Sequence, residues 1–286
     1  ARAPESGAGC ASACTNPLRS GGSRDSERKS GSMAAFLPLR PPIMRQRDTL
    51  PPIADYGLIG NRHSCALVER TGSIDWCCLP HLDDASVFGA LMDVRRGGHW
   101  RIGPAGAFVS TRAYRGNSPV LVTRFRCGSG QLRLTDFLPI RRGRGAELSY
   151  SAHSIVRIVE CVEGEVDLEI DWKPRPNYAR DDVSLHHDGT AVRASSASLD
   201  LWLCGLPAEG VELHDASARY RGHLRAGDRL DLISGMRDPD WEPVEEVTRR
   251  LLDQTLAWWE TWDERCRMTP GAEDWDGLTR RSGMVL

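Results

Sequence analysis

Three aspartates and a histidine lie close together near the start of the chain and could serve acid–base chemistry. Asp75, Asp83 and Asp84 supply carboxylates, and His81 supplies an imidazole. Hydrolysis of a glycosidic bond needs two carboxyl groups that face each other across roughly 5 to 10 Å. Proximity in sequence does not establish that geometry, and an acid beside a turn often accepts backbone hydrogen bonds. We therefore favour a structural role for the acids and a loop or core role for His81.

Two other segments carry residue types that bind metal ions. His186, His187 and Asp188 are adjacent, but on a strand next to a turn their side chains point to opposite faces. The acids of EGEVDLEID alternate along a strand and form no glycine-kinked calcium loop. The nine cysteines show no metal-site spacing, which favours buried, reduced thiols in a cytoplasmic protein. The sequence therefore predicts no metal ligands and no cofactor.

Tryptophans offer a different chemistry, because flat sugar faces pack on aromatic rings. Trp258, Trp259 and Trp262 could form such a platform, but their helical spacing favours buried anchors between two domains. Trp172 or Trp202 could line a concave sheet if the chain is a carbohydrate-binding module. The sequence contains no GxGxxG, P-loop or GxSxG motif, so it does not indicate nucleotide binding or a serine hydrolase.

Composition limits the partners of the chain. The 286 residues carry a net charge of -2, which favours neither a nucleic-acid surface nor a polybasic membrane patch. No run reaches the roughly 18 apolar residues of a membrane span, and residues 1–50 lack the apolar core of a secretory signal. We expect residues 1–50 to be a disordered leader. An organellar transit peptide is the alternative, and Met33 or Met44 could be the true start.

The elements that must position these residues are mostly strands. CALVERTGSIDWCC predicts a hairpin that turns at Gly72, and VLVTRFRCGSGQLRLTDFLP repeats the design. EVDLEIDW alternates strictly, so one face of that strand should be buried and the other wet. VSLHHDGTAVRAS turns at an Asp-Gly pair, and LRAGDRLDLIS adds a further strand. This pattern predicts a large two-sheet antiparallel β-sandwich.

The period changes after Pro243. Apolar residues then recur every three or four positions from Val244 to Cys266, which predicts a long helix with one apolar stripe. We expect this stripe to dock onto helices that the chain does not contain. The last residues predict a second helix with Trp275, Leu278, Ser282 and Val285 on one face, and we expect the sequence to be truncated within it.

Four motifs in order resemble glycoside hydrolase family 15, the glucoamylase, glucodextranase and bacterial trehalase group. They are IADYGLIGNRHSCALVERTGSIDWCCLPHLDDASVFGALMD, VTRFRCGSGQLRLTDFLP, RIVECVEGEVDLEIDWKPRPNYAR and LAWWETWDERC. Within the first motif, PHLDD departs from the usual arginine-aromatic-aspartate form at His81 and Leu82. The resemblance implies a β-sandwich and linker helix ahead of an (α/α)6 barrel, which hydrolyses an α-glucosidic bond by inversion with two glutamates.

The resemblance places both glutamates in the barrel, so we assign no catalytic residue here and leave substrate-binding residues unassigned. The predicted organisation is a leader (1–50), an N-terminal β-sandwich (51–238), a linker helix (239–270) and a truncated first barrel helix (271–286). The predicted function is a non-catalytic scaffold in a glucoside hydrolase of trehalase or glucoamylase type, with the barrel as its partner. A carbohydrate-binding module and a structural remnant that pairs with a separate barrel are the alternatives.

Overall fold

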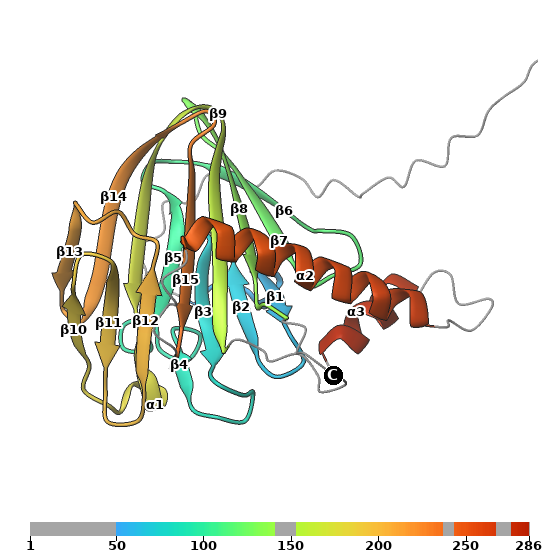
Figure 1. Ribbon diagram of the computed structural model, residues 1–286, viewed down its shortest axis with the longest axis horizontal. Helices are drawn as coiled ribbons and strands as arrows, with labels where there is room; N and C mark the ends of the chain where they lie inside the picture. Colours follow the sequence, from blue (N-terminus) through green and yellow to red (C-terminus); the bar gives the residue numbers. More distant parts are fainter. Residues whose placement is uncertain (1–49, 141–152, 237–242, 267–275, 286) are drawn as a thin grey trace, which may run out of the picture. The chain divides into compact units, whose positions relative to one another are not determined.

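The computed structural model describes residues 50–140, 153–236, 243–266 and 276–285. The fold is mostly β, and its strands form a large antiparallel sheet followed by helices (Figure 1), which confirms the predicted class. Residues 1–49 of the predicted leader lie outside the described part. None of the helices in the described part has the length and apolar character that a membrane span requires.

The strands follow one another through short loops for most of the chain. They are β1 (Tyr56–Gly60), β2 (Cys65–Glu69), β3 (Ser73–Cys78), β4 (Ser86–Phe88), β5 (His99–Pro104), β6 (Val109–Tyr114), β7 (Leu121–Arg126), β8 (Gly130–Phe137), β9 (Ser154–Lys173), β10 (Ser184–His187), β11 (Ala191–Ser195), β12 (Asp200–Cys204), β13 (Val211–His214), β14 (Ser217–Arg225) and β15 (Arg229–Gly235). The helical elements are η1 (Ile53–Asp55), α1 (Pro176–Ala179), α2 (Val244–Arg265) and α3 (Asp276–Val285).

Strand β9 joins the sheet together because its two halves pair with different neighbours. Residues 154–160 lie between β8 and β15, and residues 165–173 lie between β5 and β14. Gly164 marks the change: its φ is 66°, and a Cβ there would lie 2.1 Å from the Ser129 carbonyl oxygen. Only glycine fits this position. The hydrogen bonds thus link fifteen strands of the described part into one network.

The predicted hairpins are confirmed. β2 and β3 pair antiparallel on either side of Gly72, whose φ of 82° requires the left-handed conformation. The β7–β8 and β10–β11 pairs also form where the turn residues predict them. In the second half of β9, Val166, Leu168, Ile170 and Trp172 are buried in the core. The alternation of this strand therefore separates a core face from an outer face as expected.

A fully buried ion pair crosses the interior. The Nε of Arg157 in β9 donates to Oδ1 of Asp136 in β8 at 2.8 Å, and both side chains are inaccessible to solvent. The guanidinium also donates to the carbonyl oxygens of Gly72, at 2.7 Å, and Trp100. Arg157 therefore ties β8 and β9 to the β2–β3 turn and to β5 on the other side of the core.

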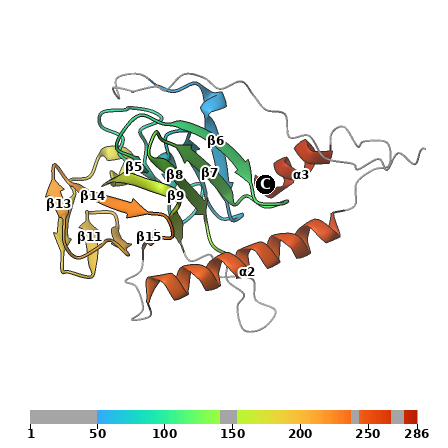
Figure 2. The same cartoon turned by 90° about the horizontal axis from the view of Figure 1, so that it is seen from above.

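Helix α2 packs along the sheet on the side of β15 (Figure 2). Leu251 is buried in an apolar cluster with Phe137, Val156 and Ile158 of the sheet and with Val120, which directly precedes β7. Further along the helix, Trp259 is fully buried with Ile140 and with Met284 of α3. The helix predicted from the change of period is thus confirmed, with its apolar stripe buried.

The expectation that this stripe docks onto helices absent from the chain is wrong. Leu251 and Trp259 are covered by the sheet and by α3 of the same chain. The exposed residues of α2 are mostly polar, which follows from its amphipathic pattern; they include Glu245, Glu246, Arg249, Arg250, Asp253, Glu260 and Glu264. The stripe therefore stabilises this chain and is not a free apolar surface.

Helix α3 differs from its predicted orientation. Ser282, expected on the buried face, is exposed, and Met284 is buried instead. The reason is the packing with α2, because Met284 joins the cluster around Trp259. Arg281 fixes this orientation by donating to the Ser118 carbonyl oxygen at 2.7 Å. Trp275 and the side chains of Leu278 and Val285 lie outside the described residues.

Candidate functional site

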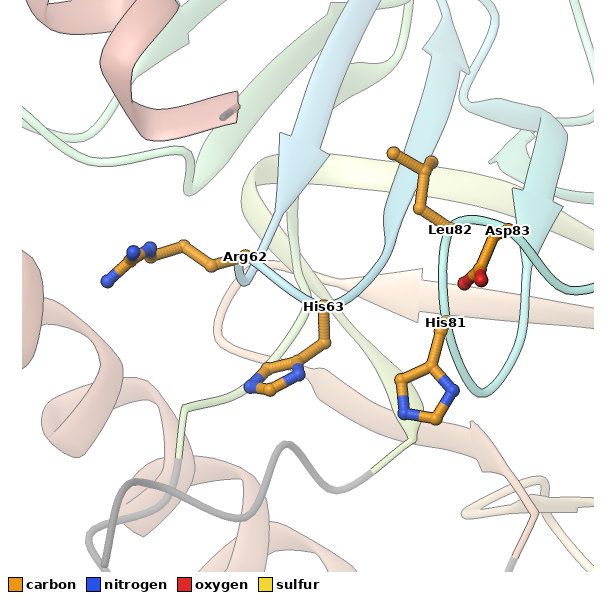
Figure 3. Close-up of a pocket in the computed structure, with 5 residues that line it drawn as sticks. All are labelled: Arg62, His63, His81, Leu82 and Asp83. Atoms are coloured by element: carbon orange, nitrogen blue, oxygen red, sulfur yellow. The ribbon is translucent and has the colours of Figure 1, made fainter.

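An open pocket of about 640 Å³ lies where two loops meet at one end of the sheet. The turn between β1 and β2 contributes Arg62 and His63, and the loop between β3 and β4 contributes His81, Leu82 and Asp83 (Figure 3). The pocket is therefore built from the segment in which the sequence analysis found the acids and the histidine.

Hydrogen bonds hold the two loops in place. Oδ1 of Asn61 accepts the backbone N–H groups of His63, at 3.1 Å, and Ser64, at 3.0 Å. The Leu82 N–H donates to the His63 carbonyl oxygen at 2.8 Å, and the Ser64 hydroxyl donates to the Cys78 carbonyl oxygen. The loops are thus connected to each other as well as to the strands, and the side chains of the pocket stand on a rigid base.

Arg62 turns away from the rest of the pocket. Its φ of 69° is in the left-handed region, and its guanidinium lies 5.9 Å from the ring centroid of Trp258 in α2. Figure 3 shows the side chain directed away from His63 and His81. This cation–π contact links the pocket to the helix.

Three histidines gather at the pocket. The ring centroids of His63 and His81 are 6.3 Å apart. Those of His81 and His153, the residue before β9, are 5.5 Å apart with the rings at 75°. Burial lowers the pKa of His63, and the nearby His81, His153 and Arg62 lower it further. A neutral imidazole is therefore favoured at position 63.

Hydrogen bonds fix the tautomers of two of these rings. Nδ1 of His81 lies 3.0 Å from Oδ2 of Asp84, and Nδ1 of His153 lies 3.3 Å from the Pro80 carbonyl oxygen. A carboxylate and a carbonyl can only accept, so each Nδ1 carries the proton. In the neutral rings, Nε2 then holds the free lone pair.

The acids beside His81 lie on one exposed turn. One ligand atom each from His81, Asp83 and Asp84 lies within 4.8 Å of the others. Asp84 also accepts the backbone N–H of His81 at 2.9 Å, so it caps the turn. Asp83 and Asp84 do not face each other across a cleft, which the two carboxyl groups of a glycoside hydrolase must do. Imidazole and carboxylate together can instead bind a cation or hydrogen-bond a polyol.

Asp75 has the structural role that the sequence analysis favoured. It is buried, and its carboxylate accepts hydrogen bonds from the Tyr56 hydroxyl, at 2.9 Å, and the Ser73 hydroxyl, at 2.5 Å. The bond from Tyr56 connects β1 to β3, and the bond from Ser73 lies within β3. Asp75 does not line the pocket that contains His81.

The segment His186, His187 and Asp188 also behaves as a turn. Oδ1 of Asp188 accepts from the backbone N–H groups of Thr190, at 2.8 Å, and Ala191, at 2.9 Å. These bonds and one from the Thr190 hydroxyl lower the pKa of Asp188 to about 2. The carboxylate of Asp188 thus accepts hydrogen bonds within the β10–β11 hairpin.

The tryptophans proposed above for sugar binding, all of which lie in the described part of the chain, do not form the exposed platform that a binding module would need. Trp172 is fully buried and donates from Nε1 to the Ser234 hydroxyl at 3.1 Å, so its proposed place on an open sheet face is wrong. Trp202 is half-buried, and the guanidinium of Arg193 lies 5.2 Å from its ring centroid. Trp259 is fully buried, whereas Trp258 and Trp262 pack partly buried around it.

The sequence analysis missed His63 and His153 as members of the site. Both are single histidines, and each is far along the chain from the other. The antiparallel pairing of β1 with β2 places residue 63 at the end of the sheet where β9 begins. The sequence signal for His63 was the GNRHS turn, which was assigned only to the family resemblance.

The described residues define a class of protein in which a mainly antiparallel β domain is covered by a long helix and carries an open polar pocket. The chain belongs to the family of trehalase-like N-terminal domains, which it matches over residues 46–252. This confirms the trehalase-like part of the resemblance.

Curated relatives are consistent with this assignment. The chain is similar to a trehalase of Mycolicibacterium smegmatis, with 31% identity over 233 residues that cover 74% of this chain and 34% of the relative. A trehalase of Mycobacterium tuberculosis is 30% identical over 233 residues, with the same coverage of 74% and 34%. A trehalase of Thermoplasma volcanium is 35% identical over 141 residues, which cover 48% of this chain and 22% of the relative. The chain thus spans about a third of the length of the first two relatives.

Proposed function

We propose that this chain is the N-terminal, non-catalytic scaffold of a trehalase-type glucoside hydrolase. The observation that carries the proposal is the match to the trehalase-like N-terminal family together with the length of the relatives, of which this region makes up 34%. In the proposal, an (α/α)6 barrel from the remaining length of such a protein supplies the two catalytic glutamates. The named relatives favour trehalose over a starch-like substrate.

The scaffold in this proposal is a two-sheet β-sandwich whose strand sets share β9, followed by a linker helix. Arg157 supports the sandwich arrangement, because it spans the core from β9 to the carbonyl oxygen of Trp100 in β5. The pocket loops, which expose Leu82, are the proposed contact with the barrel. A cytoplasmic location remains part of the proposal.

The test is a chimera with the trehalase of Mycolicibacterium smegmatis. Its matched 233-residue region is replaced by residues 46–286 of this chain, and a second version simply lacks the region. We expect the chimera to release glucose from trehalose and the deletion version to be inactive, because the barrel needs a scaffold. A folded chimera with no more activity than the deletion version would contradict the scaffold role. A preference for maltooligosaccharides over trehalose would contradict the trehalase type.

A carbohydrate-binding module is the second candidate, and it is weaker because Trp172 is in the core. It predicts measurable heat when the isolated chain is titrated with millimolar trehalose. We expect no such heat.

A further inference from the structure

Three histidines that are distant in sequence converge at the pocket described above. His63 belongs to the β1–β2 turn, His81 to the β3–β4 loop and His153 to the segment that leads into β9. The rings of His63 and His81 lie side by side below their loops (Figure 3), and the His153 ring meets the His81 ring edge-on. The three imidazoles come from three separate segments, so a local turn motif does not explain why they lie together. They form a candidate set of metal ligands.

In the rings of His81 and His153, a hydrogen bond engages Nδ1 and leaves Nε2 available. Asp84 engages Nδ1 of His81, and the Pro80 carbonyl oxygen engages Nδ1 of His153. Both rings are thereby prepared to offer the Nε2 lone pair. A carboxylate or carbonyl behind the ring is the arrangement that orients histidines bound to metal ions.

The ring separations agree with a shared ion. An imidazole nitrogen binds zinc at about 2.0 to 2.1 Å, which places two ring centres on one ion roughly 5 to 6 Å apart. His81 and His153, at 5.5 Å, fall within this range. His63, at 6.3 Å from His81, lies slightly beyond this range and has to move closer before all three rings can share one ion.

We propose that His63, His81 and His153 bind a borderline divalent transition-metal ion, with Zn²⁺ as the representative. Imidazole nitrogen suits zinc, nickel and copper. Asp84 is the positioning residue, because it orients His81. The guanidinium of Arg62 lies over Trp258, and its charge is still felt at His63, whose pKa it lowers. The proposal does not rest on the scaffold role, although both proposals involve the loops of this pocket.

Calorimetric titration of the untagged, full 286-residue chain with Zn²⁺ tests the site. We expect one ion per chain, and a loss of affinity of at least about tenfold in His81→Gln and in His153→Gln. Asp84→Asn should also weaken binding by about tenfold, because the ring loses its orienting carboxylate. His186→Gln is the matched control, since His186 is an exposed histidine in β10, and it should bind zinc as the unaltered chain does.

Three results of the zinc titrations and one with cobalt would overturn the proposal. One is the absence of stoichiometric binding by a chain whose circular dichroism shows it to be folded. Another is an equal loss of affinity in the His186→Gln control. The third is a loss in Asp83→Asn with none in His153→Gln, which would assign the ion to the acidic turn instead. Titration with Co²⁺ gives a second readout, because a thiolate-to-cobalt absorption band would assign the ion to cysteines.

Discussion

At the scale of single residues, Arg157 and Asp136 are the pair on which the interior depends most. Removing two charges from water costs several kcal/mol per ion, and close pairing with further hydrogen bonds must offset that cost. The Gly72 and Trp100 carbonyl oxygens supply those further bonds to Arg157. A change that removes only one charge leaves the other buried without its partner.

Asp136→Asn should therefore lower the free energy of unfolding by about 3 to 5 kcal/mol, the usual cost of breaking a buried pair. Urea denaturation of the isolated chain measures the change. Glu160→Gln is the matched control, because it breaks the partly exposed pair with Arg133 and should cost about 1 kcal/mol or less. Similar losses in both variants would contradict the role assigned to the buried pair.

His223 is the residue whose titration the structure predicts most simply. Its ring bonds to Asp167, at 2.9 Å, and to Glu165, at 3.3 Å, and these bonds raise the pKa of His223 above its usual 6.5. Its contribution to stability is thus fully present below pH 6.5 and is lost as the pH rises through the raised pKa.

An NMR titration of the His223 ring should show this raised pKa, and Asp167→Asn should bring the pKa down because the larger of the two hydrogen-bond effects is removed. Glu212→Gln removes a carboxylate from β13 and should leave the titration of His223 unchanged. An unaltered pKa in Asp167→Asn would show that the ion pair does not form in solution.

At the scale of elements, the packing of helix α2 is centred on Trp259. Trp259 meets the rings of Trp258 and Trp262 edge-on, with centroids 4.8 and 5.6 Å away. Such aromatic contacts add to the stabilisation from buried area. The helix is therefore an integral cover of the sheet in this chain.

Trp259→Ala should reduce the free energy of unfolding by about 3 to 5 kcal/mol, because it leaves a cavity between α2 and α3. Glu260→Ala, on the exposed side of the helix, should change it by less than about 0.5 kcal/mol. Urea denaturation of the isolated chain compares the two. A neutral Trp259→Ala would mean that the stripe is not packed within this chain and waits for another partner.

The elements themselves were largely predictable from the sequence, because hairpins and the period of a helix are local signals. Gly72 and Pro243 each marked a boundary that the structure confirms, and the alternation in EVDLEIDW identified a part of strand β9. What covers the apolar stripe of α2 is a contact between distant segments, so periodicity alone did not determine it. The left-handed backbone at Asn177, Tyr178 and Ala179, with φ of 54°, 57° and 59°, was also missed, because none of these residues is glycine.

The candidate site was predictable only in part for the same reason. His81, Asp83 and Asp84 are neighbours in sequence, and their turn was identified as rich in chemistry. His63 and His153 join them only through the strand pairing that brings β1, β3 and β9 to one end of the sheet. Ligands at short spacing can be recognised in a sequence, but a cluster that is assembled from three separate segments cannot.

At the scale of the whole molecule, the proposed role of this chain is to support catalysis that takes place elsewhere. The chain belongs to the trehalase-like N-terminal family and spans about a third of the length of the two mycobacterial trehalases. In the acidic turn, one carboxylate caps the turn and the other is exposed, and neither faces a second acid across a cleft. The scaffold role follows if the reaction takes place in a separate helical domain.

The most direct test is a glucose-release assay of the purified 286-residue chain with trehalose, run beside the full-length trehalase of Mycolicibacterium smegmatis as the positive control. The account predicts no glucose above the background of buffer and substrate. Glucose release that grows in proportion to the amount of chain, and persists after further purification, would contradict it.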